Sequence, residues 1–373
     1  MVGRTHFSKS ETNFIKGIGI LMIMFHNYFH IIPPITGENE FSFSSRDFDN
    51  FISLLSLNPF SSIRYIFSYL GHYGVQLFIF FSAYGLFLSY KEREIHFFKF
   101  LKKRILKIYP ALVIVVLFLL LFITGYEAEL PEPEKLKSIL LKLTLVFNFI
   151  PGEALSVSGP LWFFSLIVQF YIVFPFLLFI TKKYGEKSML FMALGFVIIS
   201  LLFNSFLIRN DLSLYFTFVG QLPVFCLGIY FAARPVIKIS NGIILVALIL
   251  FVTGNVNEYV WHFSFAAFTI LMLAVFIFII PLMKRLKKLN AFLVFTGGFS
   301  LFLFAVHGMV RYPFEAIAEK YGEPIITTLL CFVYVAATYL FAEIVRWLES
   351  KLQALIASDS VLYRGLSKEE STT

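Results

Sequence analysis

The dominant feature of the sequence is a succession of ten apolar stretches, each long enough to cross a lipid bilayer. A transmembrane helix needs about 20 mainly apolar residues. The chain of 373 residues is 58% hydrophobic and only 14% charged, which leaves too few charged side chains to cover a soluble globular domain. The sequence therefore predicts an all-α integral membrane protein, a bundle of about ten transmembrane helices. The predicted spans are residues 14–32, 70–90, 105–124, 158–180, 189–208, 213–232, 237–254, 260–282, 291–311 and 325–347.

An even number of crossings places both termini on one side, and the basic residues indicate which side it is. With the N-terminus in the cytoplasm, the inner segments hold 23 of the 31 basic residues and 9 of the 23 acidic residues. The outer segments hold the other 8 basic residues and the other 14 acidic residues. The inner charge is then +14 and the outer charge −6, which sum to the net charge of +8. We therefore predict a multi-pass protein of the inner (cytoplasmic) cell membrane with both termini in the cytoplasm. Its positive charge reflects orientation and does not indicate a nucleic-acid partner.

Little of the chain lies outside the predicted bundle. Residues 1–357 are assigned to one polytopic membrane domain and residues 358–373 to a short cytoplasmic tail. The first apolar run lacks a small-residue cleavage site, so it predicts a retained helix and not a signal peptide. Residues 138–150 are too short to span and suit a re-entrant or interfacial helix. Cys226 and Cys331 each lie in an apolar run, and predict neither a disulfide nor a zinc site.

Polar side chains inside the predicted spans mark the candidate site, because such groups are costly in lipid and usually face the bundle interior. Spacings of three or four residues place the polar side chains of one helix on the same face of that helix. The polar faces of the different helices converge on the middle and outer leaflet of the membrane. Hydrogen-bonded packing and contact with interfacial water are the alternative roles for each of them. The candidates are His26, Asn27 and His30 of the first span, His72 and Gln76 of the second, Trp162, Ser165 and Gln169 of the fourth, and His307 of the ninth.

No carboxylate occurs among these candidates. Buried aspartate or glutamate is the usual means of ion-coupled transport, whereas imidazole with amide and hydroxyl groups suits proton transfer near neutral pH. A metal site formed by His26, His30 and a third histidine fits the spacing. It lacks a carboxylate or cysteine companion, however, so the sequence predicts no metal.

Three basic residues lie at the ends of predicted spans, deeper than the positive-inside rule requires. Lys16 begins the first span, and Arg104 and Lys107 lie three apart at the start of the third, just before Tyr109 and Pro110. The remaining basic residues of the segment before the third span are explained by orientation alone. We therefore expect Lys16, Arg104 and Lys107 to face an anionic ligand at the cytoplasmic side.

Six segments occur in the order and at about the spacing of a known family. On these segments the chain resembles the membrane-bound acyltransferase family 3, the bacterial integral-membrane O-acyltransferases that modify cell-surface sugars. The segments are KGIGILMIMFH (16–26), GVQLFIFFSAYGLFLSY (74–90), KRILKIYPAL (103–112), GPLWFFSLIVQFYIVFP (159–175), LPVFCLGIYF (222–231) and SLFLFAVHG (300–308).

The resemblance implies transfer of an acyl group, typically acetyl from acetyl-coenzyme A, to a hydroxyl of a sugar. The family's basic residue and histidine of the first helix correspond to Lys16 and His26. This chain departs from the commonest pattern, because lysine replaces arginine and the histidine comes one position early, where Asn27 would be expected. It also has Ala83 in place of a glycine and Gln169 in place of a frequent glutamate.

These observations together predict a membrane O-acyltransferase that uses acetyl-coenzyme A and no metal. The phosphates of coenzyme A are expected on Lys16, Arg104 and Lys107, with the pantetheine arm passing Gly17, Gly19 and Ala83. His26 is the predicted general base, and His30 shares its role. Gln169 and Ser165 are expected to stabilise the oxyanion, with Asn27 as a further candidate. The predicted substrate-binding residues are Asn27, His72, Gln76, Trp162 and His307.

Two alternatives stay open at this point. Transfer can be direct or can pass through an acyl-enzyme, and both fit the same residues. A polytopic carrier or flippase of glycans or lipids, without acyl chemistry, is the competing function. The acceptor is expected to be a glycan or lipid-linked sugar that is recognised by the outer loops 33–69 and 125–157, and the sequence assigns no oligomeric state.

Overall fold

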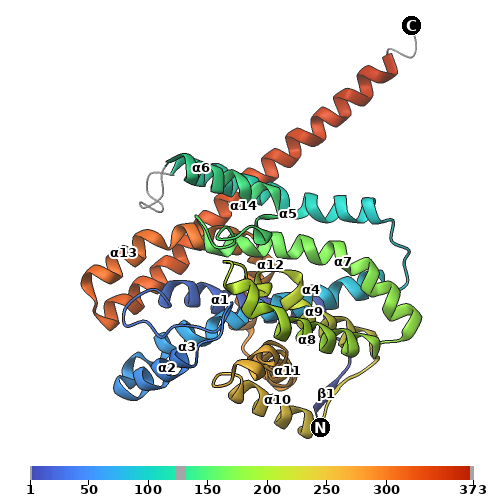
Figure 1. Cartoon of the computed structure of the whole chain (residues 1–373). Helices are drawn as coiled ribbons and strands as arrows, with labels where there is room; N and C mark the ends of the chain where they lie inside the picture. The colour runs from blue at the N-terminus through green and yellow to red at the C-terminus, as the bar shows by residue number, and fades with distance from the viewer. Residues whose placement is uncertain (1, 123–131, 370–373) are drawn as a thin grey trace.

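The chain folds into a bundle of long helices with almost no sheet (Figure 1). The computed structural model describes residues 2–122 and 132–369. Each of the ten predicted spans coincides with a helix, so the apolar runs located the helices correctly. These helices are α1 (Lys9–Phe29), α4 (Gly74–Tyr90), α5 (Phe97–Leu121), α7 (Trp162–Tyr184), α8 (Ser188–Ile208), α9 (Phe218–Ala233), α10 (Asn241–Thr253), α11 (Glu258–Met283), α12 (Lys287–Val310) and α14 (Pro324–Glu369).

Within the described residues, seven helical segments are long and apolar enough to cross a membrane. These segments are Pro59–Tyr90, Phe97–Leu121, Gly159–Tyr184, Ser188–Ile208, Glu258–Met283, Lys287–Val310 and Pro324–Ala354. Helices α9 and α10 are apolar but shorter, and α1 carries Lys9, Glu11 and Lys16 near its start. The protein is thus an all-α membrane protein, and the ten crossings and the cytoplasmic termini stay predictions.

The connecting segments contain shorter elements. Residues 138–150 do not form the interfacial or re-entrant helix predicted for them, because they contain only the end of α6 and two 3-10 turns. The short helices are α2 (Ser45–Leu57), α3 (Ser62–Leu70), α6 (Glu132–Leu141) and α13 (Tyr312–Tyr321). The 3-10 turns are η1 (Pro59–Ser61), η2 (Gly71–Tyr73), η4 (Lys142–Thr144), η5 (Phe147–Phe149), η6 (Gly159–Leu161) and η7 (Leu214–Phe216).

Contacts near the N-terminus gather several inner segments at one end of the bundle. Strand β1 (Val2–Arg4) pairs antiparallel with β2 (Ile237–Ile239), which lies between α9 and α10. Glu11 accepts ion pairs from Arg4 at 2.6 Å and from Lys284, beyond α11, at 2.8 Å. The segments before α1, after α9 and after α11 therefore share one end, as the predicted topology requires. Figure 1 shows α13, α2 and α3 at the other end.

Helix α1 is held in the middle of the bundle by close backbone contacts. A Cβ at Gly17 would collide with the carbonyl oxygen of Leu293, and one at Gly297 would collide with that of Asn13, so α1 and α12 touch through their backbones. Ser8 and Glu11 form a capping box that fixes where α1 begins. This packing sets the position of both Lys16 and His26 on one rigid helix.

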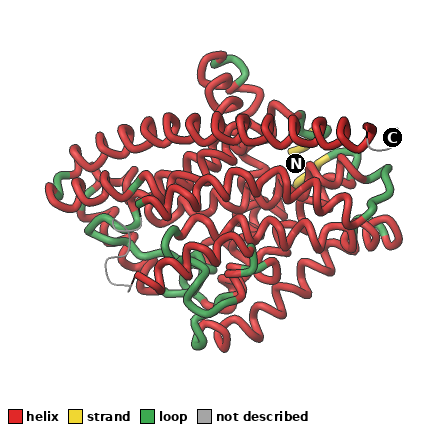
Figure 2. Tube along the Cα trace, turned by 90° about the horizontal axis from the view of Figure 1, so that it is seen from above, coloured by secondary structure: helices red, strands yellow, loops and turns green. Residues whose placement is uncertain are grey.

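The C-terminal helix is longer than the predicted tenth span. Helix α14 continues through Glu369, so residues 358–369 of the predicted tail are helical, and residues 370–373 lie outside the described part. Figure 1 shows this end of α14 projecting away from the bundle, and Figure 2 shows the same bundle seen from above.

Candidate active site

His26 is buried in α1 and its ring is oriented by the backbone. Its Nδ1 lies 2.9 Å from the carbonyl oxygen of Ser68 and 3.3 Å from that of Phe67. Carbonyl oxygens only accept hydrogen bonds, so Nδ1 carries a proton and Nε2 is the nitrogen free to exchange one. The approach is possible because Gly71 has no side chain, since a Cβ there would lie 2.6 Å from the Cβ of His26.

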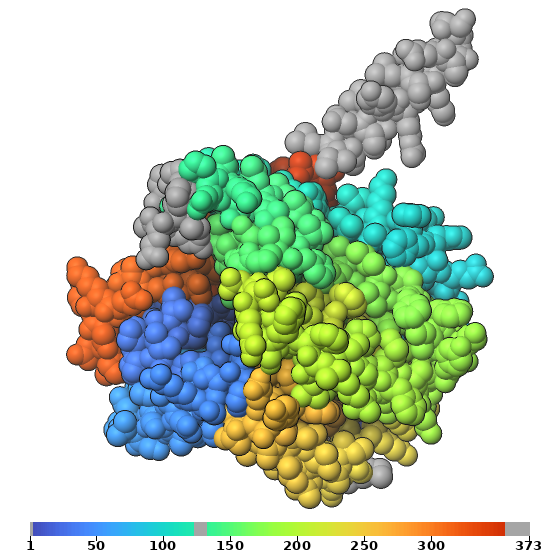
Figure 3. Space-filling model, in the orientation of Figure 1, coloured from blue at the N-terminus to red at the C-terminus, as the bar shows by residue number. Residues whose placement is uncertain are grey.

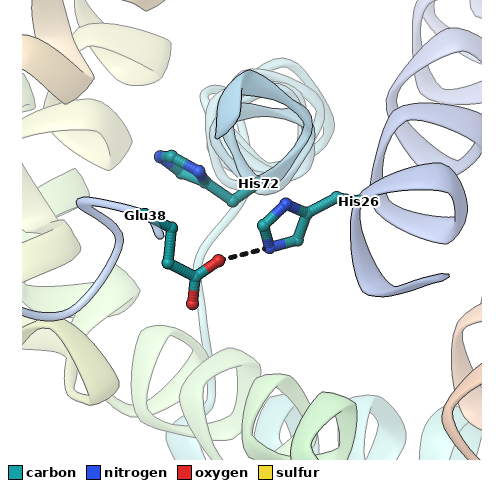
Figure 4. A group of neighbouring side chains, drawn as sticks. All are labelled: His26, Glu38 and His72. Carbon is teal, nitrogen blue, oxygen red and sulfur yellow. Dashed lines mark ion pairs between the residues drawn. The ribbon is translucent and has the colours of Figure 1, made fainter. Parts of the chain in front are cut away.

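A carboxylate that lies outside the predicted spans faces this nitrogen. Oε2 of Glu38 lies 2.7 Å from Nε2 of His26 (Figure 4). Oε2 of Glu40 lies 3.9 Å from the same nitrogen. Both glutamates belong to the segment between α1 and α2. The expectation of a site without carboxylates is therefore wrong, because Glu38 and Glu40 lie outside the apolar runs.

The segment that carries the two glutamates is fixed by buried hydrogen bonds. Arg64 donates to the carbonyl oxygens of Ile32 and Pro33. Asn39 donates to the hydroxyl of Tyr69 at 3.0 Å, and the indole of Trp261 donates to the carbonyl of Asn39 at 2.8 Å. These contacts hold both sides of the loop, so Glu38 is presented to His26 by a preorganised segment.

The two glutamates differ in protonation. Burial acts to raise the pKa of Glu38, but the imidazoles of His26 and His30 and the hydrogen bond from His26 lower it below its usual range. Burial and the adjacent charge of Glu38 raise the pKa of Glu40 well above its usual range. Glu38 is therefore the more acidic of the two carboxyl groups, and Glu40 keeps its proton to higher pH than Glu38 does.

A polar cavity of about 250 Å³ surrounds this pair. It brings together five of the residues predicted from the sequence, His26, Asn27, His30, His72 and Trp162. It also contains side chains that the sequence did not single out, namely Glu38, Glu40, Phe41, Arg311 and Tyr312. We call it the outer cavity, because it lies toward the predicted outer ends of α1 and α12.

Arg311 supplies positive charge to the outer cavity. It donates to the carbonyl of Asn27 at 2.7 Å, and its Nε lies 3.2 Å from Glu315. Its place just after α12 therefore ties the end of that helix to the end of α1. Figure 3 shows the N-terminal segments in blue lying against the C-terminal segments in orange on this part of the surface. Burial raises the pKa of Glu315 to about 7, against the lowering effect of Arg311.

A second and larger cavity, of about 640 Å³, lies toward the other end of α1. Lys16 and Lys107 both line this inner cavity, with Lys9 and Asn13 beside them. Within the described residues neither Lys16 nor Lys107 forms an ion pair. Glu349 also lines the cavity and accepts a hydrogen bond from Gln353. Two cations without an acidic partner make this cavity suited to an anionic ligand.

The comparison with protein families agrees with this arrangement. A family described as an acyltransferase domain matches residues 10–344, about nine tenths of the chain. The chain belongs to the acyltransferase 3 family. This acyltransferase shows no significant match among curated proteins or solved structures. The resemblance inferred from six sequence segments is confirmed, and the matched region includes every lining residue of both cavities except Lys9, Glu349 and Gln353.

Five predicted site residues of the acyltransferase line neither cavity, namely Gln76, Arg104, Ser165, Gln169 and His307. Ser165 donates to the carbonyl of Leu145 at 2.6 Å, and the amide of Gln169 links Ser165 to the backbone N–H of Phe218. These bonds connect α7 to its neighbours, so this placement favours a packing role for Ser165 and Gln169. His307 is buried with Nδ1 directed at the carbonyls of Leu303 and Phe304, and both amide atoms of Gln76 lack hydrogen-bond partners.

Arg104 and the small residues expected along the pantetheine arm also lie elsewhere than the sequence predicts. Arg104 does not line the inner cavity, and its guanidinium lies 5.4 Å from the ring centre of Tyr90 and 5.8 Å from that of Tyr171. Tyr171 does line the cavity, so Arg104 lies behind it. The small residues expected along the arm serve helix packing: Gly17 contacts α12, Gly19 contacts α4, and Ala83 contacts α9 at Gly228.

The acyltransferase also has one cluster with the composition of a metal site. His26, Glu38 and His72 each offer a ligand atom, and these atoms lie within 4.8 Å of one another (Figure 4). Among the residues that the structure describes, neither ring nitrogen of the buried His72 has a partner in hydrogen-bond geometry. Glu38 thus supplies the carboxylate ligand that the spaced histidines of the sequence lacked. The prediction that no metal is used stays a prediction.

Proposed function

We propose that this acyltransferase transfers an acyl group, in the first place acetyl, from acyl-coenzyme A to a hydroxyl of a cell-surface or lipid-linked glycan. We place it in the inner membrane, with the bilayer as its surroundings. The observation that carries the proposal is the orientation of His26. Its Nδ1 is held by the carbonyl of Ser68, so Nε2 is directed at Glu38 in the outer cavity.

The reaction follows from this orientation. Nε2 of His26 takes the proton of the acceptor hydroxyl as its oxygen forms a bond to the thioester carbonyl carbon. The tetrahedral oxyanion then collapses, the carbon–sulfur bond breaks, and the coenzyme A thiolate leaves and receives the proton from Nε2. The ionised Glu38 stabilises the imidazolium that exists between these two proton transfers. Arg311 lines the same cavity and supplies positive charge for the oxyanion.

The lining of the outer cavity supports a sugar acceptor. Glu38 and Glu40 supply oxygens that accept hydrogen bonds from hydroxyl groups, and Trp162, Phe41 and Tyr312 supply ring faces and edges. A cavity of about 250 Å³ suits one sugar unit and not a long polymer segment. We infer that a terminal or single residue of the glycan enters, with the rest of the chain outside.

The inner cavity supports a phosphorylated donor. Lys16 and Lys107 face it without ion-pair partners in the described part of the chain, and charge-assisted contacts to phosphate are among the stronger hydrogen bonds. We assign phosphate docking to these two lysines, with Arg104 behind them at Tyr171. The donor and acceptor then enter from opposite ends of α1.

Purified protein supplied with labelled acetyl-coenzyme A and a panel of glycan acceptors tests the proposal. We expect thioester consumption with label transferred to the glycan. His26→Ala should lower this rate by about 10² to 10⁴-fold, the usual contribution of a general base. The matched control is His262→Ala, a buried histidine that hydrogen-bonds Tyr215 outside both cavities. A stable labelled protein formed without acceptor would indicate transfer in two steps.

Glycan or lipid translocation without thioester consumption would replace the proposal with the carrier function. Full activity of His26→Ala would show that another group is the base.

The docking of the donor is tested separately by kinetics. Lys16→Gln and Lys107→Gln should each raise KM for acyl-coenzyme A about tenfold, the equivalent of about 1.4 kcal/mol of lost binding. KM for the acceptor should not change, because the lysines lie in the other cavity. Lys102→Gln is the matched control, since Lys102 is exposed on α5 and does not line the inner cavity. An unchanged donor KM in both variants would contradict the assignment.

A further inference from the structure

The two cavities meet at a single aromatic group. Phe304 lines both of them, and Phe78 and Phe163 line the inner cavity on the side of Phe304. The three phenylalanines come from three helices, α4, α7 and α12. They therefore lie between the lysines of the inner cavity and His26 of the outer cavity.

The three rings contact one another as a triangle. The ring centres of Phe163 and Phe304 are 4.8 Å apart, those of Phe78 and Phe163 are 6.3 Å apart, and those of Phe78 and Phe304 are 6.4 Å apart. These separations are those of packed aromatic pairs, so no open channel passes between the rings. Phe78 and Phe304 are buried, and Phe163 is half-buried. We call this triangle the aromatic constriction.

Helix α1 leaves room for one of these rings. A Cβ at Gly19 would lie 3.2 Å from the ring of Phe78, closer than ordinary van der Waals contact. Gly19 lies between Lys16 and His26 on the same helix. The absence of a side chain at Gly19 leaves the space next to α1 that the Phe78 ring occupies.

The proposed chemistry requires passage through the constriction. A donor held by Lys16 and Lys107 has to bring its thioester carbon to about 3 to 3.5 Å from an acceptor oxygen beside His26. The direct route between the two cavities passes the three rings, and all three are apolar. An acyl thioester is also apolar, whereas the phosphates and the sugar are not. The constriction is therefore suited to admit the acyl end and to retain the polar ends on either side.

We propose that Phe78, Phe163 and Phe304 determine which acyl groups are transferred, by limiting the size of the group that can pass from the inner to the outer cavity. This inference rests on the proposed function for its substrate, and on the two cavities and the ring contacts for its location. The rings turn aside for a short acyl thioester and surround the attached arm of the donor until the acyl group has been transferred. A longer or branched acyl group cannot be accommodated between them.

The first test measures access and does not depend on catalysis. Val75→Cys places a thiol in the outer cavity, in a background where Cys226 and Cys331 are replaced by alanine. A small charged thiol reagent, a sulfonated methanethiosulfonate, is added at the face that carries the N-terminus. We expect slow labelling in the parent protein and labelling at least about tenfold faster when Phe304→Ala is added. Labelling from the opposite face should be fast in the parent protein and in the Phe304→Ala variant, which shows that both proteins are folded.

The second test measures selectivity with acetyl- and hexanoyl-coenzyme A. Phe304→Ala should raise the ratio of kcat/KM for hexanoyl over acetyl by about tenfold or more, because one methylene in a tight apolar site already discriminates by roughly that factor. The matched control is Phe302→Ala on the same helix, which lines the inner cavity but is not part of the triangle.

The outcomes separate the inference from the proposed function. Unchanged labelling in Phe304→Ala, or an unchanged acyl selectivity in an active protein, overturns the role of the constriction. Failure of the parent protein to consume any acyl thioester overturns the proposed function, and the labelling experiment still reports whether the rings close the passage. An equal shift of acyl selectivity in Phe302→Ala would also overturn the role of the constriction. The loss of any bulky side chain from α12 would then be sufficient to change the selectivity.

Discussion

His26 shows how a buried histidine acquires a defined role from its surroundings. In many catalytic sites a carboxylate holds Nδ1 and leaves Nε2 for the substrate. Here the backbone carbonyl of Ser68 holds Nδ1, and the carboxylate of Glu38 lies at the reactive nitrogen. Glu38 therefore competes with the acceptor for the same position and stabilises the ring once it is protonated. This arrangement links the activity to the charge of Glu38.

Glu38→Gln removes the charge beside Nε2 and keeps the size of the side chain. Without that charge the imidazolium is less stable, so the ring loses its proton at lower pH and the acidic limb of the pH–rate profile should move to lower pH. The plateau rate should fall about tenfold or more, since the imidazolium formed during the reaction also loses its partner. Transfer rates measured from pH 5 to pH 9 check both effects.

Glu40→Gln is the matched control for this prediction. Burial and the charge of Glu38 raise the pKa of the Glu40 carboxyl well above its usual range, so an amide at this position changes the charge less than an amide at Glu38 does. Its oxygen lies 3.9 Å from Nε2, beyond hydrogen-bond distance. We expect the profile of Glu40→Gln to resemble that of the parent. A shift in Glu40→Gln with none in Glu38→Gln would show that the roles are reversed.

Among the elements, α1 is the one that connects the two cavities. Lys16 and His26 are ten residues apart, which corresponds to about 15 Å along a helix. The helix is kept straight and central by glycine contacts with α12 at Gly17 and Gly297 and with α4 at Gly19 and Gly74. A small displacement of α1 would change the inner and the outer cavity together.

Gly17→Ala tests this dependence. Its Cβ would collide with the backbone of Leu293, which cannot turn aside as a side chain can, so α1 and α12 must separate. We expect a loss of stability of about 1 to 3 kcal/mol, the usual cost of overpacking, together with a large loss of transfer activity. Thermal unfolding in detergent and the acyl-transfer assay measure the two effects. Gly195→Ala on α8 is the control, because a Cβ there meets nothing within 4 Å and should be tolerated. Equal stability of the two variants would contradict the close crossing.

The elements were predictable from the sequence, whereas the site was predictable only in part. Runs of about 20 apolar residues locate helices because the bilayer requires that length. Helical spacing gives the relative direction of the side chains on one helix. It does not identify the neighbouring element that each face of the helix contacts. Ser165 and Gln169 share a face with Trp162, yet only Trp162 lines a cavity.

Glu38 illustrates the other limit. It lies in a connecting segment without hydrophobic periodicity, and it reaches His26 through tertiary contacts such as that of Trp261 with Asn39. These contacts join residues far apart in the chain. The only sequence signal was two glutamates, Glu38 and Glu40, just beyond a helix that carries two histidines.

For the whole molecule, the decisive property is that its two cavities lie at opposite ends of the bundle. The inner cavity lies toward the end where β1 pairs with β2 and where Glu11 binds Lys284. The outer cavity lies toward α13 and the segment before α2. A donor made on one side of a membrane can then serve an acceptor on the other side. This division of substrates requires that the inner end be cytoplasmic.

Cysteine labelling of the intact protein tests that requirement. Lys187→Cys and Lys288→Cys lie on exposed connections at the inner end, and Arg46→Cys and Lys320→Cys lie exposed at the outer end. In a background without Cys226 and Cys331, an impermeant maleimide added to intact cells stripped of any outer membrane should label only the outer pair. The same reagent added to inverted vesicles should label only the inner pair. Ten crossings place successive connecting segments on alternate sides of the membrane, and the basic residues favour the cytoplasmic side. Labelling of Lys288→Cys and Lys320→Cys from the same side would mean that α12 does not cross, and the donor and acceptor would then have to enter from one face.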